Sequence, residues 1–121
     1  MKTILLCDDS QFIRKRVKAI LFNPEFNFLE AGDGEEALKC IKSDHVDLII
    51  LDMLMPKVTG KEVLATMFEE NVNIPVIVLS ADIQESTIKY CLEKGASAFL
   101  NKPPKNEDLI EKVKAILNIR I

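Results

Sequence analysis

The sequence has 121 residues, of which 48% are apolar and 29% charged, and its formal net charge is −3. This length fits one domain with a hydrophobic core of its own, and the composition is that of a globular chain, not a disordered one. The mildly acidic charge offers no extended basic stripe, so we expect no direct nucleic-acid partner.

The same composition argues against membrane and disulfide classes. The longest apolar runs reach roughly six residues, against the ~20 that a bilayer-spanning helix needs. A lone Lys2 before a short apolar run does not make a secretory signal. The cysteines are odd in number and lack C-x-x-C spacing, so we predict neither a disulfide framework nor a zinc site, no membrane contact, and a reduced cytoplasmic setting. They are Cys7, Cys40 and Cys91.

The first half of the chain reads strand, helix, strand, helix. Residues 3–7 are a continuous apolar run, typical of a strand buried on both faces. An amphipathic helix follows, which Pro24 is expected to end. Its apolar stripe consists of Ile13, Val17, Ile20 and Leu21. Residues 26–31 are predicted to form the second strand, and Asp33 to cap the next helix.

The third strand is the most apolar one. It is predicted at residues 46–51 and runs straight into Asp52. After a loop, Thr59 and Glu62 form a capping-box pattern that predicts a helix start. The buried side of that helix is expected to consist of Val63, Leu64, Met67 and Phe68. Residues 75–79 then form the predicted fourth strand.

The last part of the chain adds a helix, a strand and a helix. Asp82 with Glu85 predicts a helix start, and Gly95 a helix end. The residues predicted to face inward from this helix are Ile88, Cys91 and Leu92. The fifth strand is predicted at residues 96–100. The final helix carries a clear apolar stripe, made by Leu109, Ile110, Val113, Ile116 and Leu117.

Strands that alternate with helices predict a parallel sheet covered on both faces, that is, a three-layer doubly wound α/β sandwich. We find no linker or repeat and expect one domain over residues 1–121. Arg14-Lys15-Arg16 with Lys18 is interpreted as a solvated helix face.

Chemically active side chains follow the predicted strands. Asp8 and Asp9 follow the first strand, and Asp52 follows the third. Ser80 follows the fourth strand and Lys102 the fifth. Because the carboxyl ends of parallel strands meet at one edge of a sheet, these five side chains are expected to converge there.

The convergence predicts phosphoryl chemistry with a metal ion. Three carboxylates raise one another's pKa unless a counter-charge is present, and Mg²⁺ prefers carboxylate oxygens while keeping several waters. A lysine ammonium suits a phosphate as a point charge. A carboxylate such as that of Asp52 is also a known nucleophile toward phosphorus.

Five motifs stand in order at the expected strand ends. They are Asp8-Asp9, the run from Leu51 to Pro56 with Gly60, Ser80-Ala81, Gly95-Ala96, and the run from Phe99 to Pro103. Over essentially the whole chain this pattern resembles the receiver domain of bacterial two-component response regulators, close in size to single-domain chemotaxis regulators. The resemblance implies a five-stranded parallel sheet in the order 2-1-3-4-5, which is the flavodoxin-like arrangement.

The resemblance also implies roles for the site residues. Asp52 would be the phosphoryl acceptor, forming 4-aspartylphosphate, with Lys102 paired to the phosphoryl group. Asp9 and Asp52 would bind Mg²⁺ or Mn²⁺ directly, and Asp8 through a water. The backbone carbonyl of Leu54 would complete the metal site.

A second set of implied roles concerns switching. The Ser80 hydroxyl would bind the phosphoryl group, and Phe99 would turn inward on activation. A core role for Phe99 is nearly as well supported by the sequence. The peptide bond between Lys102 and Pro103 is often cis in the family.

The implied partners are a sensor histidine kinase or phosphotransfer protein and an output protein or fused effector domain. The output would contact the face of the fourth helix, fifth strand and fifth helix, and phosphorylation could bring two copies together as a dimer. The domain would be a switch with self-catalysed phosphoryl transfer and autodephosphorylation, not a metabolic enzyme. The chain is expected to be either a stand-alone receiver or a fragment of a longer regulator.

Other interpretations are weaker. Asp8 and Asp9 could simply cap the first helix. Gly32-Asp33-Gly34 begins a G-x-G-x-x-A match to the dinucleotide fingerprint, but it follows the second strand and carries two glutamates that would repel a pyrophosphate. A haloacid-dehalogenase-like phosphohydrolase would need a second aspartate at Leu54. A receiver-like module that is never phosphorylated would not need the complete set of site residues.

Overall fold

Apolar strands and amphipathic helices alternate in the computed structural model, which describes residues 1–119. The strands are β1 (Lys2–Cys7), β2 (Phe26–Ala31), β3 (Leu48–Asp52), β4 (Val76–Ser80) and β5 (Ala98–Asn101). The helices are α1 (Gln11–Ile20), α2 (Gly34–Ser43), α3 (Gly60–Glu69), α4 (Glu85–Glu93) and α5 (Asn106–Leu117). The predicted domain of residues 1–121 includes Arg120 and Ile121, which lie outside the described residues.

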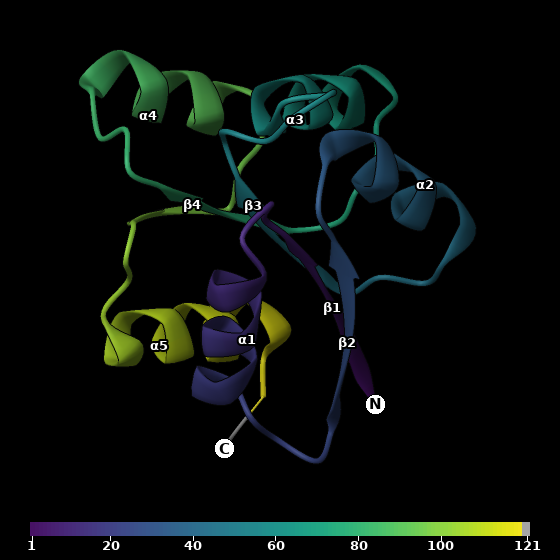
Figure 1. Ribbon diagram of the computed structural model, residues 1–121, viewed down its shortest axis with the longest axis vertical. Helices are drawn as coiled ribbons and strands as arrows, with labels where there is room; N and C mark the ends of the chain where they lie inside the picture. Colours follow the sequence, from purple (N-terminus) through teal and green to yellow (C-terminus); the bar gives the residue numbers. More distant parts are fainter. Residues whose placement is uncertain (120–121) are drawn as a thin grey trace.

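The sheet is parallel with the strand order β2-β1-β3-β4-β5. Helices α1 and α5 cover one face, while α2, α3 and α4 cover the other (Figure 1). The predicted three-layer doubly wound sandwich and its strand order are therefore confirmed. Across residues 1–119, helices long and apolar enough to span a bilayer are absent.

Successive residues of the central strands feed two separate cores. In β3, Leu48 and Ile50 pack with α1 and α5, whereas Ile49 and Leu51 pack with α2, α3 and α4. All four are buried. This follows from the two-residue period of a strand, and it explains why β3 is a continuous apolar run instead of an alternating one. A rigid central strand therefore delivers Asp52 to the edge of the sheet.

Side-chain caps fix where three helices begin. The Ser10 hydroxyl accepts from the N–H of Ile13, and Asp33 accepts from Glu36 in the same way. The predicted capping box between Thr59 and Glu62 is present in both directions. Each cap satisfies a backbone donor that the first turn of a helix leaves without a partner.

The last three strands extend one residue further than predicted and begin one or two residues later. Their predicted bounds were 46–51, 75–79 and 96–100, against β3, β4 and β5 as observed. Pairing across the sheet decides these ends, because Asp52 pairs with Leu79 and Ser80 pairs with Asn101. Asp52 and Ser80 are thus held by the sheet itself and do not lie in the loops beyond it.

Two predictions were wrong: the residue at which α4 begins, and the burial of one apolar residue each in α4 and α3. The helix begins at Glu85 with Gln84 as N-cap, because Asp82 instead forms a turn that accepts the N–H of Gln84. Leu92 and Phe68, predicted to be buried, are 52% and 51% exposed. An apolar stripe is buried only where a neighbour covers it, and α4 buries Cys91 alone.

The C-terminal ends of α1 and α4 can be compared with the predicted helix ends. Helix α1 ends at Ile20 with Leu21 as C-cap, three residues before the predicted stop at Asn23-Pro24. Gly95 follows the C-cap of α4 with φ +91°, a left-handed conformation that glycine adopts without strain, as a residue ending a helix should.

The three cysteines are free, and Cys7 and Cys91 are buried. Burial raises the pKa of both thiols, so they behave as small apolar side chains.

Candidate functional site

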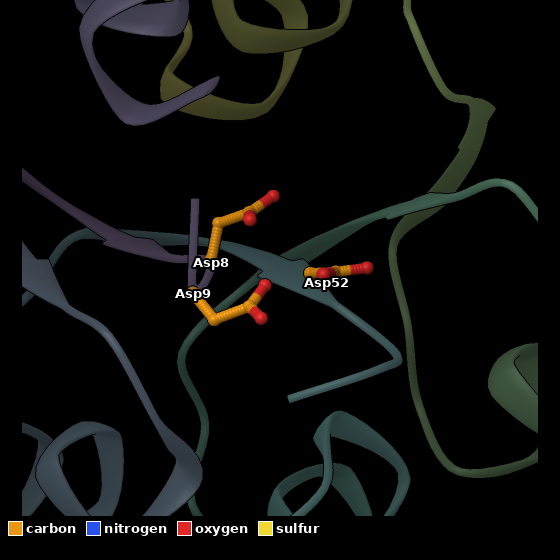
Figure 2. Close-up of side chains that lie close together, drawn as sticks. All are labelled: Asp8, Asp9 and Asp52. Atoms are coloured by element: carbon orange, nitrogen blue, oxygen red, sulfur yellow. The ribbon is translucent and has the colours of Figure 1, made fainter. Parts of the chain in front are cut away.

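Three aspartates meet at the carboxyl ends of β1 and β3. One carboxylate oxygen from each of Asp8, Asp9 and Asp52 lies within 4.8 Å of the others. Figure 2 shows the Asp9 side chain extending toward Asp52, with Asp8 beside them. Asp8 and Asp52 are buried and Asp9 is exposed, so the cluster opens to solvent on the Asp9 side.

Lys102 supplies a positive charge to this cluster. Its Nζ lies 2.8 Å from Asp8 Oδ2 and 3.2 Å from Asp52 Oδ2. The N–H of Lys102 donates to the carbonyl of Ser80, which carries the β4–β5 pairing one step beyond the strand. The peptide bond to Pro103 is cis. Burial lowers the pKa of Lys102, but the hydrogen bond to Asp8 and the charge of Asp52 outweigh it, so the pKa lies above its usual value.

The charges of the cluster do not balance within the protein. Three carboxylates and one ammonium leave a formal charge of −2. The pKa of Asp52 is raised, first by burial and then by the charge of Asp8, and Lys102 offsets this only in part. A donor set of carboxylate oxygens with two excess negative charges fits a hard divalent cation.

Ser80 connects the site to α4. It is buried at the end of β4, one residue beyond the partner of Asp52, and its Oγ accepts from the N–H of Asp82 at 3.0 Å. Asp82 in turn accepts from the Thr87 hydroxyl at 2.7 Å. Two hydrogen bonds therefore lead from Ser80 into the first turns of α4.

Leu54 and Phe99 occupy different surroundings. The N–H of Leu54 donates to Asp52 Oδ1 at 3.4 Å, while the Leu54 side chain is exposed. Phe99 lies in β5 opposite Val78 and packs, partly buried, against the core that contains Cys91 of α4. The core role of Phe99 is thus observed, and its movement on activation stays a prediction.

Comparison with known proteins places this arrangement in a family. The family model described as response regulator receiver domain matches residues 4–114. The chain belongs to this family. The receiver domain is 37% identical over 115 residues to the transcriptional regulatory protein DegU of Brevibacillus brevis, covering 93% of this chain and 49% of that protein. It spans about half the length of the curated relatives it matches.

Solved structures agree with this assignment. The receiver domain of the Francisella response regulator 1452 superposes with a TM-score of 0.91 at 30% identity, covering 98% of both chains. The response regulator Rcp1, solved in its Mn²⁺-bound form, superposes with a TM-score of 0.80 at 28% identity, covering 96% of this chain and 91% of that one. Receiver domains are the signalling switches of two-component phosphorelay systems, and that is the class of protein to which this chain belongs.

One residue of the receiver domain was misjudged from the sequence. Lys15 and Arg16 are exposed, as a solvated face requires, but Arg14 is largely buried. Its guanidinium donates to the main-chain carbonyl of Asp8 and to the Glu30 carboxylate. The spacing of Arg14 and Lys18, one helical turn apart, was the available signal, since both can face the same acidic residue.

Gly60 has a structural role that its place in the motif did not reveal. Its N–H donates to the carbonyl of Met53 at 3.0 Å, so the first turn of α3 rests on the chain just after Asp52. A Cβ at this position would overlap the carbonyl oxygen of Asp52 and lie 2.8 Å from Met53 Cα. A side chain at residue 60 would therefore displace either α3 or the backbone that carries Asp52.

Proposed function

We propose that this receiver domain, taken as residues 1–121, accepts a phosphoryl group on Asp52 from a phosphohistidine and thereby switches an output surface. The phosphohistidine would belong to a sensor histidine kinase or a phosphotransfer protein. The observation that carries the proposal is the position of Asp52, at the end of β3 between two further aspartates and Lys102. We place the domain in the cytoplasm, where thiols such as its three free cysteines stay reduced.

A divalent cation, Mg²⁺ or Mn²⁺, is the proposed cofactor. Asp9 and Asp52 would bind it directly, Asp8 through a water, and Leu54 by its backbone carbonyl. When bound, the cation neutralises negative charge on the phosphoryl oxygens. The excess negative charge of the carboxylate cluster supports this proposal, and so does the similarity to the Mn²⁺-bound Rcp1.

Asp52 and Lys102 have different roles in the proposed phosphoryl transfer. A carboxylate oxygen of Asp52 forms a bond to phosphorus while the bond from phosphorus to the donor imidazole nitrogen breaks, and that nitrogen takes up a proton from water. Lys102 balances the charge of the phosphoryl oxygens, since it already lies 3.2 Å from Asp52. Hydrolysis of the acyl phosphate by water would return the domain to its resting state.

Switching is proposed to run from Ser80 to α4. The Ser80 hydroxyl would donate to a phosphoryl oxygen, and its hydrogen-bonded neighbours Asp82 and Thr87 would carry the shift into the helix. Helix α4 is suited to move, because it buries Cys91 alone and the side chain of its N-cap, Gln84, makes no capping hydrogen bond. Phe99 would follow it inward.

The output surface is proposed to be the face of α4, β5 and α5. It would bind an output protein, a fused effector domain or, after phosphorylation, a second copy of the domain. The curated relatives are about twice as long as this chain, and several are called transcriptional regulatory proteins, which supports an effector as one of these partners. Each phosphorylation state would favour one arrangement of the face.

Mapping the phosphoryl group tests the proposed function. We expect incubation with acetyl phosphate and Mg²⁺ to produce one phosphoryl adduct, which borohydride reduction and peptide mass spectrometry locate at Asp52. Chelation of the metal should prevent the adduct. An adduct on a different residue would refute the assignment, and steady hydrolysis of small phosphate esters would favour a phosphohydrolase instead.

Replacing Lys102 with methionine is expected to slow phosphoryl uptake by at least about tenfold, because a charge-assisted hydrogen bond contributes about 1.5–3 kcal/mol. The initial rate of adduct formation with acetyl phosphate at saturating Mg²⁺ measures this effect. Lys105→Met removes an exposed lysine three residues further on and serves as the matched control. Equal rates for the two variants would contradict the proposed role of Lys102.

A further inference from the structure

The main-chain carbonyl of Asp8 is held by a side chain from α1. Arg14 Nη1 donates to this carbonyl, and Arg14 Nε donates to Glu30 Oε1 at 2.9 Å. The Arg14 side chain is only 16% exposed. Its planar guanidinium can make both bonds at once because its donors point in fixed, different directions.

Glu30 anchors the far end of this connection in β2. Its second oxygen accepts from Lys18 Nζ at 2.9 Å, so one carboxylate binds two cations of α1. The hydrogen bonds from Lys18 and Arg14 hold the pKa of Glu30 below its usual value, so this carboxylate stays ionised to a lower pH than an isolated glutamate. The guanidinium is therefore fixed to the sheet as well as to α1.

The carbonyl in question belongs to the peptide unit that joins Asp8 to Asp9. The N–H of Asp8 donates to the carbonyl of Ala31 in β2, so the backbone of Asp8 is held on both sides. The plane of this peptide places the N and Cα atoms of Asp9 and so limits where its Cβ can lie. Asp9 itself is exposed, and its carboxylate must still reach within 4.8 Å of Asp52.

We propose that Arg14 is a positioning residue for the divalent cation, because it fixes the Asp8–Asp9 peptide and so aims Asp9 at the site. This inference rests on the proposed function, which makes Asp9 a direct ligand. It goes further by assigning a role to Arg14, a side chain that does not contact the metal ion. Mutation of residues that orient metal ligands typically lowers metal affinity by about 10–100-fold.

Electrostatics and positioning predict opposite effects when Arg14 is removed. Arg14 is a positive charge beside a cluster of carboxylates, so losing that charge alone would strengthen cation binding. Losing the hydrogen bond from Arg14 to the Asp8 carbonyl would instead let the Asp8–Asp9 peptide rotate, and this would weaken the binding of the metal ion. The sign of the change in affinity therefore distinguishes the two explanations.

The test is the affinity for Mn²⁺, followed by electron paramagnetic resonance of the free ion, with Mg²⁺ as competitor. We expect Arg14→Met to weaken Mn²⁺ binding by about tenfold. Lys18→Met is the matched control, because it breaks an ion pair of the same 2.9 Å length with Glu30 but does not reach Asp8. That control should stay within about twofold of the unaltered domain, since an exposed ion pair contributes little.

Arg14→Lys is the second variant, and it covers the case in which Arg14→Met does not fold. It keeps the charge, but one ammonium group cannot reproduce both arms of the guanidinium, so positioning predicts weaker binding where electrostatics alone predicts no change. Unfolding by urea in the presence of a chelator reports separately on stability. Unchanged or tighter Mn²⁺ binding in a folded Arg14 variant would overturn the inference. If the unaltered domain binds no Mn²⁺, the proposed function fails, and the inference fails with it.

Discussion

Replacing Asp52 with asparagine is expected to abolish phosphoryl uptake and, at the same time, to stabilise the metal-free domain. The first effect follows because an amide is no nucleophile toward phosphorus. The second follows because the ionised Asp52 carboxylate is buried and faces Asp8, and both factors raise its pKa. We expect a gain of about 1 kcal/mol in the free energy of unfolding, the size typical of relieving a destabilised functional site.

The stability gained by replacing Asp52 with asparagine should increase as the pH rises. Since the pKa of Asp52 is higher in the folded chain than in the unfolded one, the unfolded carboxyl loses its proton first as the pH rises. The contribution of Asp52 to stability is therefore present below the unfolded pKa and is lost as the pH rises through the folded pKa. The asparagine variant has no such loss, so its advantage should be small in acid and full at neutral pH.

Urea unfolding followed by circular dichroism, with a chelator present, measures this difference at two pH values. Asp44→Asn removes an exposed aspartate and is the control, for which we expect little change. Adding Mg²⁺ should stabilise the unaltered domain more than the variant, because ligand binding to the folded state adds to stability. An Asp52→Asn variant that is less stable than the unaltered domain at neutral pH would contradict the pKa argument.

Substituting Gly60 with alanine is expected to destabilise the domain by about 3 kcal/mol, at the upper end of the effects of overpacking. In an ordinary helix the same change would stabilise by about 1 kcal/mol, because glycine is the poorer helix former. The sign reverses here because the new Cβ would overlap the carbonyl oxygen of Asp52. Either α3 moves away or the end of β3 moves, and both changes disturb the surroundings of Asp52, the proposed acceptor.

Gly32→Ala is the matched control for Gly60→Ala. A Cβ at Gly32 would meet only the ends of two side chains, Arg14 Nη1 at 3.6 Å and Glu36 Oε1 at 3.8 Å. We expect that variant to stay within about 0.5 kcal/mol of the unaltered domain, as substitutions away from tight contacts usually do. If Gly60→Ala is as stable as Gly32→Ala and binds Mn²⁺ equally well, then the close approach of α3 to Asp52 matters neither for stability nor for metal binding, and the prediction is wrong.

The order of elements and the doubly wound parallel sandwich could be predicted because the signals for them are local and repeated, whereas the strand order followed from the resemblance to receiver domains. Continuous apolar runs differ from helical stripes within a few residues, and right-handed crossovers restrict how parallel strands can be joined. Because the carboxyl ends of parallel strands meet at one edge of the sheet, the sequence also predicts that Asp8, Asp52 and Lys102 lie together there. The errors lie where burial depends on a neighbour, as at Leu92 and Phe68.

The sequence by itself determined the class of protein and placed Asp52, the proposed acceptor, at the end of a strand, since residue type and strand position are properties of the chain. Tertiary structure alone decided how Asp52 is held. The raised pKa of Asp52 and its ion pair with Lys102 depend on segments far apart in sequence. The contacts of Arg14 with Asp8 and of Gly60 with the backbone at Asp52 join residues six and eight positions apart, but they depend on how one element packs against another. Such contacts depend on angstrom-scale packing of α1, α3 and the β5–α5 loop, which no local pattern of residues encodes.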